Sequence, residues 1–298
     1  MKLSVKKRAI IALCIVGLSY TLLNVSVRLM NSGFDPLTQV YLRIGLGFFL
    51  TLLLFSRTIH YRKIKEISLR DWLILFVMGS LGYGLAVIFV TLGVLQTKLL
   101  NVAIISSTTP FFVLLFSIIF LHKRIKSKVF FFLLLSFYGV CVIATKSLLP
   151  VFSHFGIGEL YVLLYAIGIG IYVQGRKFLS QKLNNSEIAA IVMAFAFLTA
   201  FICAMVAGEK LSVAGFANPT ALFGLVLGGV LNVVVTELQN FGYAHLTPIA
   251  GSQLLLLENI YAPILGFILY QEHILSIEFL GAFIVLVGVY AYNQYAKD

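Results

Sequence analysis

Long apolar segments alternate with short polar breaks along the whole chain. Most of these segments are about 20 residues long, the length that a helix needs to cross the hydrocarbon core of a bilayer. Divided at charged clusters, prolines and glycines, the chain yields ten of them: 8–30, 36–56, 70–93, 99–121, 127–145, 158–179, 187–208, 220–243, 248–271 and 276–295. The pattern predicts an all-α polytopic membrane protein with ten transmembrane helices.

The composition supports this prediction and argues against a soluble fold. Of the 298 residues, 60% are hydrophobic and only 11% are charged, about half the charged fraction of a typical soluble domain. The formal net charge of +11 does not indicate a nucleic-acid partner, because the basic residues cluster beside apolar segments and not on a surface with stacking aromatics. We therefore expect the lipid bilayer to surround the protein and expect no nucleic acid to bind it.

The distribution of Lys and Arg predicts the orientation in the membrane. If the N-terminus is cytoplasmic, seventeen of the 22 basic residues fall in cytoplasmic segments, and only Lys98, Lys146 and Lys210 fall outside. The remaining two, Arg28 and Arg43, lie within predicted helices. By the positive-inside rule, we expect a multi-pass protein of the plasma (cytoplasmic) membrane with both termini in the cytoplasm.

The two halves of the chain resemble each other at an offset of 149 residues. This offset aligns Gly79 with Gly228, Gly93 with Gly242, Ile125 with Ile274, Ser127 with Ser276, and Gly139–Val140 with Gly288–Val289. Residues 1–148 and 149–298 therefore each look like one five-span unit. Because five is odd, the second unit enters the membrane from the opposite side, and such inverted repeats are typical of secondary transporters that work by alternating access.

Several stretches resemble the EamA-type transporters of the drug/metabolite transporter (DMT) superfamily. The stretch "LLENIYAPILGFILYQEHILSIEFLGAFIVLVGVYAY" is similar to the family's closing segment, and "SSTTPFFVLLFSIIFLHKRI", "FYGVCVI" and "DPLTQVYLRIGLGFFL" resemble parts of its first unit. Asn259 stands where the family usually has Pro, and Lys123 stands where a Glu is common in the first half. The resemblance implies transport of small metabolites, commonly amino acids or amines, without ATP. Accordingly, the chain has no G-x-x-x-x-G-K-[ST] loop.

Glu258 is the first candidate for a functional residue. It lies about eleven residues into the segment 248–271, close to the middle of the bilayer. A charged side chain at that depth costs about 2.5–3.5 kcal/mol, so it should face protein or a water-filled cavity. Three interpretations stay open: a contact to the substrate, a proton carrier, or a structural carboxylate bonded to a neighbouring helix.

The segment 220–243 carries the densest set of polar residues. Asn232, Thr236, Gln239 and Tyr243 fall on one helical face, with Asn240 and Glu237 on its shoulder. We interpret this face as part of a substrate site. Hydrogen bonding between helices is an equal alternative for Gln239 and Asn240, and Glu237 could instead serve as a gate near the cytoplasmic end.

Further candidates come from other segments. They are Tyr20 and Asn24 on a stripe with Arg28 and Asn31, Arg43, Tyr83, and Tyr165 and Tyr172 on one face of the segment 158–179. Arg43 could clamp a substrate carboxylate or form a structural ion pair. Tyr165 and Tyr172 could hold an ammonium group, or they could belong to the core or to an interfacial aromatic belt. The hydroxyls of Ser106 to Thr109 precede Pro110 and could satisfy backbone groups that the proline frees.

These features predict a secondary active transporter of small metabolites. We expect export of amino acids or related amines, driven by proton exchange or by the substrate gradient. The alternatives are import of an organic cation such as a choline-like amine, or a channel or lipid-handling protein without alternating access. No nucleophile, metal-ligand or cofactor constellation is present in the sequence, so we expect no enzyme activity and no cofactor. We expect a monomer or a homodimer.

Overall fold

The computed structural model is an all-helical bundle over the residues that it describes, which are 4–97, 99–122, 126–149, 156–261, 264 and 275–295. Lys98, the pair Ile125 and Ile274, and most of the second half of the predicted span 248–271 lie outside these residues. The helices are α1 (Val5–Met30), α2 (Pro36–Leu54), α3 (Tyr61–Lys65), α4 (Leu69–Phe76), η1 (Val77–Leu85), α5 (Ala86–Gln96), α6 (Leu99–Ser106), α7 (Thr109–Leu121), α8 (Ser127–Thr145), α9 (Ile157–Phe178), α10 (Asn185–Val206), α11 (Val213–Ala217), α12 (Pro219–His245), α13 (Pro248–Leu255) and α15 (Ser276–Tyr295).

Seven helices within the described residues are long and apolar enough to cross a membrane. They are Val5–Met30, Pro36–Leu54, Leu69–Gln96, Ile104–Leu121, Ile157–Phe178, Asn185–Val206 and Pro219–His245, and the helices Ser127–Ile143 and Ser276–Tyr292 are shorter but also apolar. Large apolar side chains such as Leu53, Phe223 and Phe283 are more than 60% exposed on the outside of the bundle. An exterior of this kind suits a lipid environment, so the chain is a multi-pass membrane protein.

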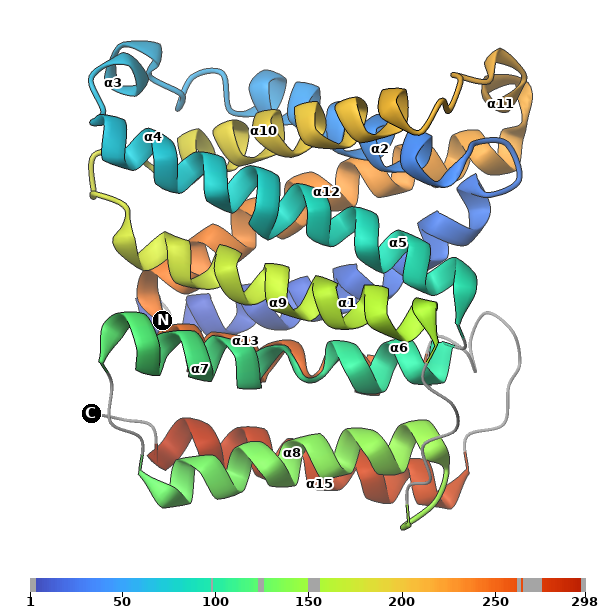
Figure 1. Ribbon diagram of the computed structural model, residues 1–298. Helices are drawn as coiled ribbons and strands as arrows, with labels where there is room; N and C mark the ends of the chain where they lie inside the picture. The colour runs from blue at the N-terminus through green and yellow to red at the C-terminus, as the bar shows by residue number, and fades with distance from the viewer. Residues whose placement is uncertain are drawn as a thin grey trace.

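The long helices lie side by side in layers (Figure 1). Helix α1 packs on α12, α2 packs on α10, and η1 and α5 pack on α9, while α8 pairs with α15 at one edge of the bundle. Both chain ends lie on one side of the bundle, which we call the terminal side. The ends of α1, α5 and α12 at Met30, Gln96 and Pro219 lie on the opposite side.

Local sequence signals explain where the helices begin. Prolines occupy the first turn of α2, α7, α12 and α13, where the missing backbone N–H costs nothing. At α10 the Asn184 side chain accepts from the Glu187 backbone N–H, and the Glu187 carboxylate accepts from the Asn184 backbone N–H in return. These signals separate adjacent helices at the bundle ends, except at α7, whose proline follows a turn within the bundle.

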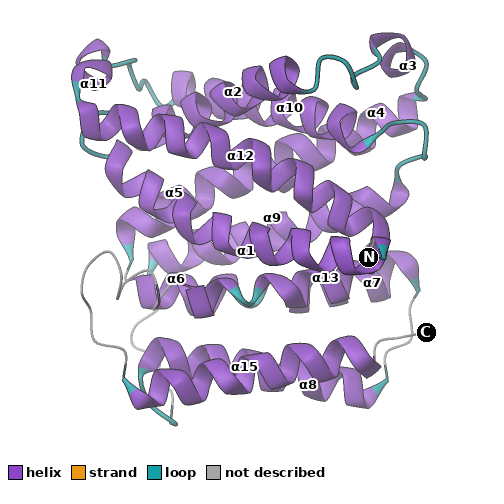
Figure 2. Ribbon diagram, turned by 180° about the vertical axis from the view of Figure 1, so that it is seen from behind, coloured by secondary structure: helices purple, strands orange, loops and turns teal. Residues whose placement is uncertain are grey.

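Three interruptions within the bundle place polar groups at mid-membrane depth. Between α4 and α5 the chain forms a π-helix of nine residues, Val77–Leu85, a local form that is frequent at functional sites. A short turn at Ser107 and Thr108 separates α6 from α7, and a turn at Leu256 and Leu257 separates α13 from the helical residues 258–261 (Figure 2). The second turn forms without the proline that the family usually has there.

The two turns have the same hydrogen-bond pattern. Thr108 N–H donates to the Ile105 carbonyl, and Leu257 N–H donates to the Leu254 carbonyl, which are i to i−3 bonds of the 3₁₀ type. In the first turn the Thr108 and Thr109 hydroxyls donate to the carbonyls of Ile105 and Ser106 at 2.6 Å. The predicted role of these hydroxyls in satisfying backbone groups is therefore confirmed.

Close packing of α1, α2 and α12 depends on glycine. Gly224 and Gly228 form a G-x-x-x-G pair on α12, a pattern that lets membrane helices approach closely. A Cβ atom at Gly228 would lie 2.5 Å from Ser26 Oγ and 2.6 Å from Arg43 Cδ. Gly228 therefore lets Arg43 lie flat against α12 in the interior of the bundle.

Candidate functional site

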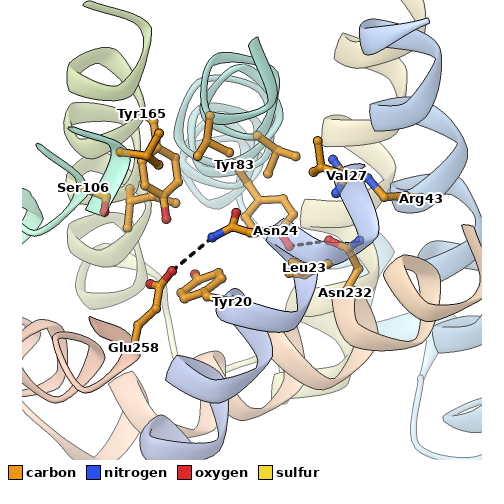
Figure 3. Close-up of a pocket in the computed structure, with 14 residues that line it drawn as sticks. Tyr20, Leu23, Asn24, Val27, Arg43, Tyr83, Ser106, Tyr165, Asn232 and Glu258 are labelled. Atoms are coloured by element: carbon orange, nitrogen blue, oxygen red, sulfur yellow. Dashed lines mark hydrogen bonds between the residues drawn. The ribbon is translucent and has the colours of Figure 1, made fainter. Parts of the chain in front are cut away.

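A cavity with about 580 Å³ of empty space lies between α1, α2, η1, α5, α6, α9, α12 and the residue that follows the turn after α13. Seven of the twelve candidate residues line it: Tyr20, Asn24, Arg43, Tyr83, Tyr165, Asn232 and Glu258. The other lining residues are Leu23, Val27, Val87, Val90, Val102, Ser106 and Ile169. Figure 3 shows Glu258 and Arg43 at opposite ends of this cavity, with Tyr20, Asn24 and Tyr83 between them.

Glu258 begins the short helical stretch after the turn at Leu256 and Leu257. This position suits a carboxylate, because the first backbone N–H groups of a helix favour negative charge. The Asn24 amide donates to Glu258 Oε1 at 3.5 Å, and the Thr21 hydroxyl donates to the Glu258 carbonyl at 3.4 Å. No basic side chain of the described residues pairs with the Glu258 carboxylate, which therefore faces the cavity with a single long hydrogen bond.

A second, smaller cavity of about 350 Å³ adjoins Glu258. Both helix breaks line it, through Ser106, Ser107 and Thr109 on one side and Leu256 and Glu258 on the other. The Asn259 amide donates to Ser107 Oγ at 2.9 Å and so joins the two breaks. Asn259 thus takes part in a polar contact that a proline at this position could not make.

Arg43 lies at the other end of the main cavity and is only 2% exposed. Its guanidinium donates to Thr91 Oγ1 at 3.0 Å, and its Nε has no hydrogen-bond partner among the described residues. An acidic partner is likewise absent from those residues. The interpretation of Arg43 as half of a structural ion pair therefore finds no support in the described part of the chain, and the guanidinium is free to meet an anionic group in the cavity.

Tyr83 and Asn232 meet at the centre of the cavity. The Tyr83 hydroxyl donates to Asn232 Oδ1 at 2.8 Å, and both side chains are almost fully buried (Figure 3). The two residues are separated by 149 positions, the same offset that aligns the two halves of the chain. The π-helix, which holds Tyr83, thus presents this side chain directly to its counterpart on α12.

The remaining five candidates do not line the cavity. Gln239 accepts from the Tyr20 hydroxyl at 3.3 Å, Asn240 accepts from the Tyr172 hydroxyl at 3.2 Å, and Tyr243 is fully buried. Both bonds join different helices, as in the alternative that Gln239 and Asn240 tie helices together. Glu237 is half-buried beside these residues, away from the cavity.

Only part of the polar stripe predicted on the first segment lines the cavity. On α1, Tyr20 and Asn24 line the cavity, but Arg28 and Asn31 are exposed at the opposite side. The sequence did not single out the apolar lining residues, such as Leu23, Val27 and Val90. Residue type alone does not distinguish a valine that lines a cavity from a valine that faces lipid. The available signal was their spacing, since Leu23 and Val27 lie three residues beyond Tyr20 and Asn24 on the same helical face.

Comparisons with known proteins agree on a transporter. A model of the EamA-like transporter family matches residues 7–145 and again residues 156–294. An uncharacterized transporter of Archaeoglobus fulgidus is 24% identical over 63% of this chain. The match covers 63% of that protein, which is less than two thirds of its length. The uncharacterized transporter YcxC of Bacillus subtilis is 24% identical over 76% of this chain and 75% of its own.

Two further matches concern export and fold. The pseudopaline exporter CntI of Pseudomonas aeruginosa is 24% identical over 67% of each chain. A crystal structure of a protein superposes with a TM-score of 0.77 over 97% of each chain at 14% identity, which shows the same fold. Because the family match covers nearly the whole chain, in two consecutive copies, this protein belongs to the EamA-like transporter family.

Proposed function

We propose that this protein is a secondary active transporter with ten transmembrane helices arranged as two inverted repeats, residues 1–148 and 149–298. Two consecutive family matches support the duplication. Equivalent features also recur at the 149-residue offset: α8 and α15 begin at Ser127 and Ser276, and the helix breaks follow Ser106 and Leu255. In this proposal the two repeats rock about the cavity and open it to each side of the membrane in turn.

The substrate in this proposal is a small metabolite with an ammonium and a carboxylate group, such as an amino acid. One observation carries it: Glu258 and Arg43 lie at opposite ends of one cavity, and neither has an oppositely charged partner among the described residues. A zwitterion supplies both missing charges, and charge-assisted hydrogen bonds of this kind are the stronger ones in proteins.

The direction that we propose is export across the plasma membrane, with both termini in the cytoplasm. The excess of basic residues in the predicted cytoplasmic segments supports this orientation, and a relative that exports a metabolite supports the direction. Either proton exchange through Glu258 or the substrate gradient supplies the driving force.

A second candidate function is import of an organic cation such as a choline-like amine. Tyr20, Tyr83 and Tyr165 line the same cavity as Glu258, and tyrosine faces attract quaternary ammonium groups. This candidate uses Glu258 and the tyrosines but leaves Arg43 without a role in binding, so the buried guanidinium favours the zwitterion.

Counterflow in proteoliposomes tests these functions together. Vesicles loaded with an unlabelled amino acid should accumulate the same labelled amino acid transiently, in a saturable manner. If labelled choline accumulates and no amino acid does, the import of an organic cation would be supported in place of amino-acid export. A flux that is linear in concentration, without stimulation from the other side, would contradict both and indicate a channel.

A further inference from the structure

A second polar group lies next to the cavity, on its terminal side. It consists of Tyr172 and Arg176 on α9 and Gln239 and Asn240 on α12, and we call it the terminal-side cluster. Tyr172, Gln239 and Asn240 are at most 1% exposed. None of the four residues lines the present cavity.

The cluster holds hydrogen-bond donors that lack acceptors. Arg176 Nε, Gln239 Nε2 and Asn240 Nδ2 are buried and have no partner among the described residues, although Gln239 and Asn240 accept hydrogen bonds through their oxygens. Arg176 donates to Asn185 Oδ1 through Nη2 at 3.2 Å. Buried donors without acceptors are rare in folded proteins, and each such group calls for an explanation. Helices α9 and α12 contact each other, so the three unpartnered donors lie in one region of the bundle. An anionic oxygen group is an acceptor that suits them.

The repeat relation gives these donors a place in the transport cycle. The offset of 149 residues pairs Tyr83 with Asn232 and Tyr20 with Ile169, and all four line the present cavity. The cavity centre is thus shared by the two halves. The same offset pairs the apolar wall residues Leu23, Val27 and Val90 with Tyr172, Arg176 and Gln239.

The present cavity reaches toward the side opposite the termini. Its wall includes Val27, three residues before the end of α1, and Val102, three residues after the start of α6. In an inverted-repeat transporter, the two halves exchange conformations when the cavity opens to the other side. In that state the terminal-side cluster replaces the apolar wall.

We infer that the terminal-side cluster is the carboxylate-binding subsite of the state that opens to the terminal side, with Arg176 as its cation. The inference rests on the proposed function and extends it to residues outside the present cavity. Glu237 lies three residues before Asn240 on α12, and its Oε1 is buried without a partner among the described residues. It supplies the counter-charge for the ammonium of a zwitterion.

The inference has a kinetic consequence. The part of the wall that the cluster forms in the terminal-side state is polar and basic. Its repeat equivalents in the opposite state, Leu23, Val27 and Val90, are apolar. A substrate with a carboxylate therefore has a lower KM on the terminal side. The difference in KM sets the substrate concentration at which transport saturates on each side of the membrane. The direction of net flux is set by the driving gradient.

Cysteine labelling tests the subsite without knowledge of the substrate. In a background with Cys14, Cys141 and Cys203 replaced by serine, Val87→Cys and its repeat equivalent Thr236→Cys form a matched pair. Val87 lines the present cavity, and Thr236 is fully buried beside the cluster. A membrane-impermeant maleimide should label Val87→Cys from the opposite side and Thr236→Cys from the terminal side. Thr236→Cys that reacts only after denaturation would overturn the inference.

Charged reagents then test the anion preference. The measured quantity is the ratio of two labelling rates of Thr236→Cys: the rate with anionic sulfonatoethyl methanethiosulfonate divided by the rate with the cationic trimethylammonioethyl reagent. Adding Arg176→Gln should lower this ratio about fivefold or more, because a nearby positive charge is lost. Arg176→Lys should keep the ratio, Glu237→Gln should raise it, and the exposed control Arg57→Gln should leave it unchanged. An equal ratio with and without Arg176→Gln would overturn the inference.

Transport measurements complete the test. Amino acids and their decarboxylated amines, such as leucine with isoamylamine and lysine with cadaverine, serve as probes in vesicles of both orientations. Arg176→Gln should raise KM for the amino acids about tenfold or more on the terminal side only, and leave the amines within twofold. An equal change on both sides, or for both kinds of probe, would overturn the inference. If the wild type transports no probe, the proposed function fails, and the labelling ratios still decide whether the subsite exists.

Discussion

The substitution Glu258→Gln addresses the residue on which the binding proposal depends most. It removes the charge and keeps the size of the side chain and its ability to bond Asn24. In the structure, the carboxylate has one long hydrogen bond of 3.5 Å to Asn24 and no basic partner among the described residues. A substrate ammonium would therefore be its principal partner.

The expected effect follows from this geometry. A hydrogen bond to a charged group contributes about 1.5–3 kcal/mol, and each 1.4 kcal/mol corresponds to about a factor of ten in affinity. We expect Glu258→Gln to raise the KM for amine-bearing substrates about 10- to 150-fold. Protein stability should change little, because the substitution leaves no new unpaired charge in the bundle.

The assay is saturable uptake into proteoliposomes, with and without an imposed pH gradient. Glu66→Gln, which alters an exposed carboxylate near α3, is the matched control. If Glu258 carries the coupling proton instead, the variant should keep its KM and lose only the acceleration by the pH gradient. A variant with unchanged KM and unchanged gradient-driven transport would refute both roles and leave Glu258 as a structural carboxylate.

Three further predictions concern packing and polar contacts. Gly228→Val should destabilise the protein by about 1–3 kcal/mol through overpacking against Ser26 and Arg43, measured by unfolding in mixed detergent. The control Gly17→Ala should not destabilise it, because the added Cβ would meet its nearest neighbour at 3.4 Å and Ala favours a helix more than Gly does. Tyr83→Phe should lower the unfolding free energy by about 0.6–1.7 kcal/mol, the range for a side-chain hydrogen bond between membrane helices, because Asn232 Oδ1 loses its donor. An unchanged unfolding free energy would contradict this. Asn259→Ala should slow turnover more than it raises KM, because it breaks the contact to Ser107 that joins the two helix breaks, and Asn259 itself does not line the main cavity. A pure KM effect would count against this role.

Much of the candidate site could be predicted from residue spacing and intramembrane polarity. Asn232, Thr236, Gln239 and Tyr243 share a face at helical spacing, and the structure buries all four, although only Asn232 lines the cavity. The cost of a charge within the bilayer singled out Glu258 and Arg43, and both line the cavity. These inferences succeed because helical periodicity and desolvation act locally and can be read from one segment at a time.

Other features depend on contacts between segments, which spacing does not determine. The stretch "VMGSLGYGL" carries no clear local signal for the π-helix that holds Tyr83. This π-helix forms where η1 packs closely on α9 and α10. The packing is so close that a Cβ at Gly82 would lie 2.9 Å from the Tyr172 backbone. The turn after α13 forms despite Asn259 in place of proline. Glu237 was grouped with Asn232 by its position on α12, yet only Asn232 reaches the cavity.

The central claim is that one cavity binds a small metabolite and opens to each side of the membrane in turn. Counterflow of labelled amino acids in proteoliposomes tests it most directly, with Glu258→Gln measured in parallel. The account predicts saturable uptake that unlabelled substrate inside the vesicle accelerates, with the apparent affinity reduced about 10- to 150-fold in the variant. Uptake that is unsaturable, indifferent to internal substrate and equal in both proteins would contradict the account.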